Sequence, residues 1–506
     1  MSGDFYLSGT PVKRELMVQR AKKLAYVLQQ KGLKKGDVIA VLLRNDPTMF
    51  EVVLACRYVG AYYVALNWHN TQAELMPILL DSKAKVLVAH NDLLADFLAP
   101  LPVGVAVLVV DTPSVIAERY AVKNMSDNSA HHAIERLYPL LAHSPMVESE
   151  PLRFRGMFSY TSGSTGQPKG IKRDYNEQSP DPFVVFAGLA KSLLQLNSGD
   201  RFYIAAPLYH SAPHALTLSC LAAGNIEVFV EAKFDPERFL ADVQQHKITH
   251  IYIVPTMMIR LLKLTRAVRQ QYDISSLRYA LSTGSACPVE VKQAMIDWFG
   301  PIFFESYGAS ELGFMTLISS AESAAKPGSV GRIIPGGSIK ILDENKQLLP
   351  SGESGLIYVY LPMFGPFKYT NIQGNIDDLH VAGHTTLGDV GYVDDDGFLY
   401  INDRKKDMII SGGANIFPAE IETLLIEMPQ IVDCAVFGAP HAEFGEMVIA
   451  AVQCVAGEAL SMQQVHEFLE GKLAKFKWPK KLDIHDSLPR EDSGKIFKHR
   501  LKVAYG

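Results

Sequence analysis

The sequence predicts an α/β fold in which helices cover parallel sheets. In the first third of the 506 residues, helix-like and strand-like segments alternate. Val12–Lys31 places apolar residues at helical spacing, and Asp37–Leu43 (DVIAVLL) is apolar after its first residue and reads as a buried strand. A strand that is apolar on both faces is typical of a parallel sheet, because helices bury both sides. We therefore expect a large N-terminal region of this type.

The same alternation continues along the chain. Gly32 is expected to end the first helix, since glycine readily adopts the C-cap conformation. The later elements of this pattern are a helix at Met49–Val59 and strands at Ala84–His90, Phe202–Ala206, Ile226–Val230, Ile251–Val254 and Tyr279–Ser282. Residues 111–150 are polar and are expected to form a surface excursion.

The C-terminal part has a different pattern. Short strands separated by turn residues predict an antiparallel β segment at Ser338–Leu342, Gly355–Tyr360 and Phe398–Ile401. The last ~100 residues predict a separate α+β unit. Its expected elements are helices near Pro418–Met428 and Met462–Lys475 and strands at Asp433–Phe437 and Val448–Cys454.

Composition excludes several classes of protein. With 48% apolar and 20% charged residues, the chain is too apolar for a disordered protein. The net charge of −5 gives no sign of nucleic-acid binding. Ten Lys/Arg against four Asp/Glu make residues 471–506 basic, which suits either a surface for phosphates or solvated helix faces.

Cysteine usage and the N-terminal sequence favour a reducing, cytoplasmic setting. The five cysteines are scattered and contain no CxxC pair, which argues against a disulfide framework and a structural zinc site. The N-terminal residues lack the pattern of a signal peptide. The longest apolar stretch, Leu98–Val110, is shorter than the ~20 residues of a membrane span.

A phosphate-binding loop is predicted at residues 160–170, whose sequence is YTSGSTGQPKG. Glycines let backbone N–H groups surround an anion, hydroxyls donate to phosphate oxygens, and a lysine neutralises charge. The residues that supply these groups are Thr161, Ser162, Gly163, Ser164, Thr165, Gly166 and Lys169. The spacing is not that of a Walker loop. The alternative is a solvated Ser/Gly linker, but the Pro-Lys-Gly ending and the preceding apolar segment favour a phosphate loop.

This motif resembles that of the adenylate-forming superfamily of acyl-CoA synthetases, nonribosomal-peptide adenylation domains and luciferases. The resemblance covers roughly Val12 to Lys502. It implies an N-terminal domain over 1–403, with parallel sheets of αβαβα type and a small β-barrel-like segment, that binds ATP and an acid. It also implies a mobile α+β domain over 404–506. The expected substrates and cofactors are ATP, Mg²⁺ and coenzyme A.

Companion motifs follow in the order that the family has them. Residues 305–311 (ESYGASE) resemble its Y-G-x-T-E motif, with Ser310 where threonine is usual. The resemblance implies that Tyr307 stacks on adenine, Ser310 binds the α-phosphate and Glu311 holds Mg²⁺. The neighbouring candidates for nucleotide binding are Ser306 and Gly308, together with Gly284, Ser285 and Ala286 of a turn that lies against adenine and the acyl group in the family. Alone, residues 305–311 also fit a strand followed by a turn.

His210 ends a P-x-x-H stretch that lies beside the substrate carboxylate and gates the acyl tunnel in the family. The alternative is a histidine packed in the core. His210 and His214 have the i,i+4 spacing of metal ligands on a helix, but Pro213 lies between them and the glutamate of H-E-x-x-H is missing, so a zinc site is not expected.

Five further residues match the C-terminal motifs of the family. Asp389 is expected to bind the ribose hydroxyls, although Leu387 replaces the usual threonine before it. Arg404 would contact the ribose, and Lys406 falls on the hinge position. The pair Gly412 and Gly413 would let the pantetheine arm pass close to the backbone. Alone, residues 403–422 also read as a charged turn before a helix.

Lys495 lies in PREDSGK and matches the family's adenylation lysine. With Glu311 and His210, it completes the candidate catalytic set. A lone lysine near a C-terminus is most often solvent-exposed, but the matched spacing from Pro489 favours the catalytic role.

The leading hypothesis is an ATP-dependent acyl-CoA ligase, an acid–thiol ligase that forms acyl-AMP and pyrophosphate and then acyl-CoA and AMP. Residues 211–218 contain no acid to pair a substrate ammonium, and residues 216–222 and Met257–Met258 are apolar. An apolar fatty, aromatic or ring-containing acid is therefore expected. The alternatives are an acyl-AMP ligase that serves a carrier protein and a non-catalytic nucleotide-binding relative. The expected partners are small molecules, with no nucleic acid and no transmembrane segment, and a homodimer is allowed for.

Overall fold

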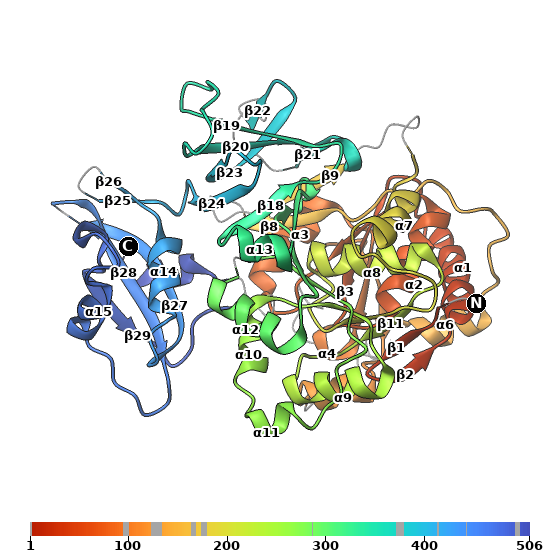
Figure 1. The fold of residues 1–506 in the computed structure, drawn as a ribbon. Coiled ribbons are helices and arrows are strands. Elements are labelled where there is room, and N and C mark those ends of the chain that lie inside the picture. The colour runs from red at the N-terminus through yellow and green to blue at the C-terminus, as the bar shows by residue number, and fades with distance from the viewer. Residues whose placement is uncertain are drawn as a thin grey trace. The chain divides into compact units, whose positions relative to one another are not determined.

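The fold is described from a computed structural model over residues 3–94, 101–122, 134–162, 168–173, 180–285, 287–370, 379–411, 414–441, 443–490 and 496–505. Two compact units make up the chain (Figure 1). Unit 1 comprises Met1–Gly284, Val291–Phe314 and Leu361–Ile376. Unit 2 comprises Ser285–Glu290, Met315–Tyr360 and Asp377–Gly506.

Unit 1 contains a parallel sheet of five strands near its N-terminus. In spatial order the strands are β4 (Tyr62–Ala65), β3 (Val38–Leu42), β5 (Val86–His90), β6 (Ala106–Val110) and β7 (Ile134–Arg136). Every pairing is parallel, and all five residues of β3 and of β5 are buried. This confirms the expectation drawn from their nearly continuous apolar sequences.

A second sheet of unit 1 carries the strands that lead into the candidate site. Its parallel strands lie in the order β14 (Phe303–Glu305), β13 (Tyr279–Ser282), β12 (His250–Tyr252), β10 (Arg201–Ile204), β11 (Glu227–Val230) and β1 (Phe5–Leu7). β2 (Thr10–Val12) adds an antiparallel edge to β1. Because these strands are parallel, their carboxyl ends meet at one edge of the sheet, where ligands of α/β proteins commonly bind.

Helices cover these sheets (Figure 1). α1 packs on α2, and α7 packs on α8. Gly60 ends α2 with φ +73°, and the Asp235 side chain caps the N-terminus of α9. The helices of unit 1 are α1 (Arg14–Gln30), α2 (Thr48–Val59), α3 (Gln72–Ser82), α4 (Asn91–Leu94), α5 (Ser114–Arg119), α6 (Leu137–His143), α7 (Pro182–Ser192), α8 (Ser211–Ala223), α9 (Pro236–His246), α10 (Pro255–Leu262), α11 (Arg266–Arg269) and α12 (Val289–Phe299).

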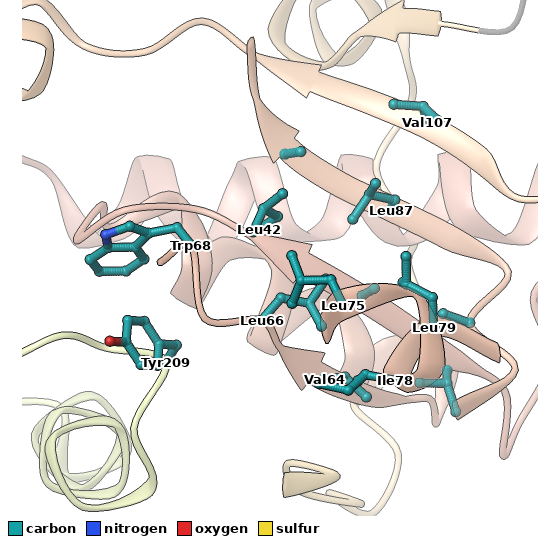
Figure 2. Packing of buried hydrophobic residues seen from close by; sticks show 14 of the residues in the cluster. Leu42, Val64, Leu66, Trp68, Leu75, Ile78, Leu79, Leu87, Val107 and Tyr209 are labelled. Carbon is teal, nitrogen blue, oxygen red and sulfur yellow. The ribbon is translucent and has the colours of Figure 1, made fainter. Parts of the chain in front are cut away.

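The core beneath the first sheet follows from the two-residue period of its strands. Alternate residues of β3, such as Leu42, face α3, whose Leu75 and Leu79 cover them (Figure 2). Trp68 and Tyr209 close one end of this cluster, with ring centroids 4.6 Å apart in an edge-to-face arrangement. The second sheet is thereby joined to the first through the segment that follows β10.

Two small antiparallel sheets complete unit 1. One has the order β21 (Phe367–Tyr369), β9 (Pro168–Arg173) and β8 (Ser159–Ser162). The other is the hairpin of β15 (Gly308–Ala309) and β16 (Gly313–Phe314). β8 and β9 carry the two ends of the predicted phosphate loop, and β15 carries Gly308 and Ala309 of the ESYGASE motif.

Unit 2 contains the predicted antiparallel β segment. Its strands follow the order β19 (Ser338–Leu342), β20 (Gly355–Tyr360), β23 (His384–Val393), β24 (Leu399–Arg404), β18 (Ser329–Ile333) and β17 (Thr316–Ser319), and β22 (His380–Val381) pairs with β23. The helix α13 (Ser320–Ala325) carries a capping box of Ser319 and Glu322.

The last part of unit 2 is a five-stranded sheet with helices, as the predicted α+β unit requires. Its strands are β26 (Ala414–Ile416), β25 (Ile409–Ser411), β28 (Gly445–Cys454), β27 (Ile431–His441) and β29 (Lys481–Ile484). Its helices are α14 (Pro418–Leu425), α15 (Met462–Leu469) and α16 (Lys498–Lys502). α14 packs against β27.

The structure confirms the predicted fold class and shifts some element boundaries. Residues 111–150, expected as a polar surface excursion, include α5, β7 and α6. The helix expected at Met462–Lys475 ends at Leu469, since Gly471 has φ +76°. The predicted domain boundary between 403 and 404 stays a prediction. Across the residues described above, no helix is both long and apolar enough to cross a membrane.

Candidate active site

The predicted phosphate loop is flanked by a pair of antiparallel strands. β8 and β9 pair so that Thr161 lies opposite Lys169, and both side chains are half-buried. Gly163, Ser164, Thr165 and Gly166, together with the side chain of Ser162, lie outside the described residues. The strands that carry the two ends of the loop are therefore placed, and the roles of its residues stay predictions.

Tight packing holds the base of the loop. A Cβ atom at Gly170 would lie 2.5 Å from Cε2 of Phe158 and would also collide with Thr370. Asp81 on α3 accepts hydrogen bonds from the hydroxyls of Tyr160, at 2.6 Å, and Thr370. A side chain at position 170 would therefore displace Phe158 or Thr370, and the two hydrogen bonds to Asp81 tie this end of the loop to α3.

The second half of the ESYGASE motif forms a hairpin whose turn holds two of the predicted site residues. Ser310 and Glu311 lie between β15 and β16. Gly308 lies so close to the opposite strand that a Cβ atom there would be 2.6 Å from the carbonyl oxygen of Gly313. The hydroxyl of Ser310 is 2.8 Å from that of Ser211, the first residue of α8. The structure therefore brings the predicted phosphate-binding hydroxyl next to the helix that follows His210.

Glu311 is almost fully buried, with 9% of its surface exposed, and it has neighbours on several sides. Its Oε1 accepts a hydrogen bond of 3.0 Å from the hydroxyl of Tyr369 on β21. Arg173 on β9 donates to the main-chain oxygens of Ser310, at 3.1 Å, and Glu311. Burial and the adjacent carboxylate raise the pKa of Tyr369, so this hydroxyl keeps its proton and remains a donor.

The chemistry of this carboxylate fits a magnesium ion of a nucleotide. Mg²⁺ prefers oxygen ligands and is commonly held by one or two carboxylates plus substrate phosphates. Glu311 offers one anchored carboxylate, and Lys169 Nζ lies 5.9 Å from the ring centroid of Tyr369. Within the described part of the chain, no group of three or more His, Cys, Asp or Glu side chains could hold a metal by itself. A magnesium site in which nucleotide phosphates supply the remaining ligands is consistent with a single protein carboxylate.

The candidate adenine-binding segments lie at the carboxyl ends of parallel strands β13 and β14. The N–H of Ser306 donates to the oxygen of Ser282 at 2.9 Å, which extends the pairing of these strands into the motif. Ser306 is buried and Tyr307 is half-buried. Gly284 has φ +98°, a backbone conformation that favours glycine. Ser285 is half-buried, and Ala286 lies outside the described residues.

The structure separates the roles of the two histidines near α8. His214 is fully buried and bonds through its two ring nitrogens to the Tyr63 hydroxyl, at 2.8 Å, and the Leu208 oxygen, at 3.1 Å. His214 is therefore a core residue. His210 is half-buried at the N-cap of α8, beside the ring of Tyr209. Its proposed position beside the substrate carboxylate stays a prediction.

His214 makes the stability of unit 1 sensitive to acid. Burial lowers its pKa to about 4 from a model-peptide value of 6.5. Below pH 6.5 the unfolded chain takes up a proton that the folded chain does not. The free energy of unfolding therefore has its full value above pH 6.5 and falls as the pH drops towards 4. At about 1.4 kcal/mol per pH unit, we expect a loss of roughly 3 kcal/mol.

Chemical unfolding of the wild type and of His214→Gln between pH 7 and 4 measures this effect. The variant should be less stable at pH 7 and the gap should close towards pH 4. A control, His143→Gln, changes an exposed histidine on α6 and should keep the wild-type profile. A constant gap between wild type and His214→Gln would contradict the assignment.

In unit 2 the predicted ribose-binding residues are neighbours. Asp389 on β23 and Arg404 on β24 are cross-strand partners, and Nε of Arg404 donates to Oδ1 of Asp389 at 3.1 Å. Asp389 is buried. Lys406 lies in the turn after β24, where the N–H of Asp407 donates to the oxygen of Arg404 at 2.9 Å. Gly412 and Gly413 lie outside the described residues.

Lys495 also lies outside the described residues, but ion pairs anchor both sides of its segment. Arg490 makes two hydrogen bonds to the carboxylate of Asp433, at 2.6 and 2.7 Å, and its backbone pairs with Ile496. Lys498 forms an ion pair of 2.8 Å with Glu422 on α14. The two ends of the segment are therefore held on β27 and α14 of unit 2.

Three residues of this region were not predicted from the sequence: Asp81, Arg173 and Tyr369. They belong to none of the motifs, and each acts by holding a motif residue or its neighbour. Strand pairing explains the positions of Tyr369 and Arg173, because β21 brings Tyr369 opposite Ile171 and Phe367 opposite Arg173 of β9. Asp81 lies on α3. A tyrosine two residues after an apolar strand residue has no distinctive spacing, so the sequence offered no signal for it.

Comparison with known proteins shows the family. Residues 15–365 match the AMP-binding enzyme family, and residues 420–495 match the AMP-binding enzyme C-terminal domain. The chain belongs to the AMP-binding enzyme family. This confirms the adenylate-forming superfamily that the phosphate-loop motif predicted.

Its relatives within this family include several acyl-CoA ligases. Indoleacetate–CoA ligase of Aromatoleum aromaticum is 31% identical over 95% of this chain and 91% of that protein. Feruloyl-CoA synthase of an Amycolatopsis species is 31% identical over 98% of this chain and 95% of that protein. The chain is thus similar to acyl-CoA ligases over nearly its full length.

Solved structures of the same family share the fold. The o-succinylbenzoate CoA synthetase of Bacillus subtilis with its acyl-adenylate intermediate has a TM-score of 0.80 and 27% identity, over 98% of this chain and 94% of that one. The same enzyme with ATP and magnesium has a TM-score of 0.81 and 26% identity, over 99% and 96%. MatB of Rhodopseudomonas palustris with ATP has a TM-score of 0.83 and 28% identity, over 100% and 96%.

Proposed function

We propose that this chain is an ATP-dependent acyl-CoA ligase that acts on an apolar, aromatic or ring-containing acid without an α-amino group. The observation that carries this proposal is similarity over both family regions to ligases of this kind. The reaction joins a carboxylic acid to coenzyme A and converts ATP to AMP and pyrophosphate. Glu311, Lys169 and Lys495 are present at the expected motif positions, which favours a catalytic protein rather than a non-catalytic nucleotide-binding relative.

In the first half-reaction, a carboxylate oxygen of the acid forms a bond to the α-phosphorus of ATP, and pyrophosphate leaves with the electrons of the broken P–O bond. Two anions must approach each other, so positive charge and a rigid phosphate cradle are needed. We assign the charge to Lys495 and to Lys169 of the loop. Ser310 would donate its hydroxyl to the α-phosphate. Tyr307, with the backbone at Gly284, would bind adenine.

Glu311 would hold the magnesium ion of the nucleotide. The fit rests on its buried, anchored carboxylate and on its place in the turn beside Ser310. When bound, the ion neutralises phosphate charge.

In the second half-reaction, the thiol sulfur of coenzyme A bonds to the acyl carbon, its proton is released, and AMP leaves. We propose that residues 404–506 rotate about Lys406 between the two half-reactions, which moves Lys495 away and brings in Gly412 and Gly413. One site would then perform both chemistries. The basic segment 471–506 is proposed to meet the phosphates of coenzyme A.

The acyl group is assigned to the apolar residues after His210. Leu216 and Leu218 of α8 and Met257 and Met258 of α10 are all buried. Ser211–Leu218 contains no carboxylate that would pair with an ammonium group. Contact between these leucine and methionine side chains and the acid stays a prediction.

A panel of acids tests the proposal. The protein is incubated with ATP, Mg²⁺ and one acid from an aromatic, fatty or amino-acid series, with and without coenzyme A. We expect acid-dependent pyrophosphate release and an acyl-CoA product with aromatic or fatty members. Pyrophosphate without thioester would favour a carrier-protein acceptor, and no pyrophosphate with any acid would favour a non-catalytic relative.

Asp389 provides a prediction about the sugar of ATP. If its buried carboxylate accepts hydrogen bonds from the ribose hydroxyls, Asp389→Asn should raise the KM for ATP about tenfold, since a charged acceptor is lost. The wild type should prefer ATP to 2′-deoxy-ATP, and the variant should lose most of this preference. An unchanged preference would remove Asp389 from the ribose site.

Two further inferences concern the setting of the enzyme. We infer a cytoplasmic location, because ATP and coenzyme A are the expected substrates and the five cysteines, all among the described residues, form no disulfide. We also propose a homodimer. Sedimentation of the purified protein distinguishes it from a monomer.

A further inference from the structure

We propose that Tyr369 is a positioning residue that orients the Glu311 carboxylate for the divalent metal of the bound nucleotide. This inference rests on the proposed function, in which Glu311 holds that metal. Tyr369 belongs to none of the motifs that indicate the family. Its assignment as a positioning residue comes from its hydrogen bond to Glu311.

Tyr369 and Arg173 restrain Glu311 at two levels. The hydroxyl of Tyr369 donates to Oε1 of Glu311 at 3.0 Å, which restricts rotation of the side chain. Arg173 donates to the main-chain oxygens of Ser310 and Glu311 and so restrains the turn itself. A carboxylate has about four lone-pair positions, so one bond to Oε1 leaves Oε2 and the remaining positions for a metal.

Strand pairing keeps the Tyr369 hydroxyl in place. On β21, Tyr369 lies opposite Ile171 of β9, and Phe367 lies opposite Arg173 of β9. The two groups that restrain Glu311 thus come from adjacent strands of one small sheet. Partners that orient a metal ligand commonly change metal affinity 10- to 100-fold when they are removed.

The same sheet carries Lys169. Its Nζ lies 5.9 Å from the centroid of the Tyr369 ring, near the upper limit for a cation–π contact. Phenylalanine at 369 keeps the ring and removes the hydroxyl, so Tyr369→Phe isolates the hydrogen bond to Glu311.

The test measures metal binding apart from turnover. Electron paramagnetic resonance follows Mn²⁺ binding to the protein saturated with a non-hydrolysable ATP analogue. We expect Mn²⁺ affinity to fall about tenfold in Tyr369→Phe and further in Glu311→Gln. AMP, which needs no metal, should bind Tyr369→Phe with wild-type affinity in calorimetry.

A matched control removes the same kind of bond elsewhere. The hydroxyl of Tyr6 on β1 donates to the Glu227 carboxylate at 3.1 Å, and Tyr6→Phe should leave Mn²⁺ affinity unchanged. If Glu311→Gln lowers Mn²⁺ affinity and Tyr369→Phe keeps the wild-type Mn²⁺ affinity, the inference is overturned but the proposed function is not. Loss of AMP binding in Tyr369→Phe would also overturn it, because the residue would then support the fold. Wild-type affinity in Glu311→Gln would overturn both the inference and the proposed metal ligand.

Discussion

Lys495→Ala is expected to abolish acyl-adenylate formation while leaving thioester formation from supplied acyl-adenylate nearly intact. The lysine is proposed to stabilise the charge that develops as carboxylate and α-phosphate meet. Groups that stabilise such charge are commonly worth 100- to 1000-fold in rate. We expect pyrophosphate release to fall by at least about 100-fold.

The two half-reactions are measured separately, by pyrophosphate release and by coenzyme A consumption from synthetic acyl-adenylate. Lys263→Ala, which changes an exposed lysine of unit 1, is the control and should keep both rates. An equal loss of both half-reactions in Lys495→Ala would contradict a role for this lysine in only one of them.

Lys406→Pro is expected to stop the rotation between the half-reactions. Proline fixes φ near −65° and restricts the residue before it, so a hinge that must change its backbone angles cannot do so. The turn at 404–407 would be held in one conformation. One half-reaction should survive and the other should fall about 100-fold, because a displaced catalytic group costs that much.

Asp395→Pro is the matched control for this change. Asp395 is exposed in the turn closed by the bond from Gly397 N–H to Asp394 oxygen, at a position that favours proline. It should leave both half-reactions unchanged. Unchanged turnover in Lys406→Pro would remove Lys406 from the hinge.

Much of the fold follows from local sequence, and the reason differs by element. β3 and β5 were predicted because they are apolar along nearly their whole length, as is typical of a parallel strand that is buried on both faces. The strands β19 and β20 were predicted with their observed ends. α6 and β7 were not predicted, since they are short and their sequence lacks a clear period.

The candidate site divides in a similar way. Ser310 and Glu311 could be found because a motif places them in one turn. Asp389 and Arg404 could also be named, but their hydrogen bond depends on the register of β23 and β24. Tyr369 and Arg173 could not be found, because they meet Glu311 only after β21 and β9 pair. Contacts made across strands far apart in sequence leave no local pattern.

Isotope transfer tests the central claim most directly. The protein is given ATP, Mg²⁺, coenzyme A and an acid accepted in the panel, labelled with ¹⁸O in its carboxylate. If the acid attacks the α-phosphorus, the bridging oxygen of the acyl-adenylate comes from the acid and leaves with AMP. Mass spectrometry should find one ¹⁸O in each AMP formed and one in each acyl-CoA. Unlabelled AMP, or ADP as the nucleotide product, would contradict adenylate formation by this protein.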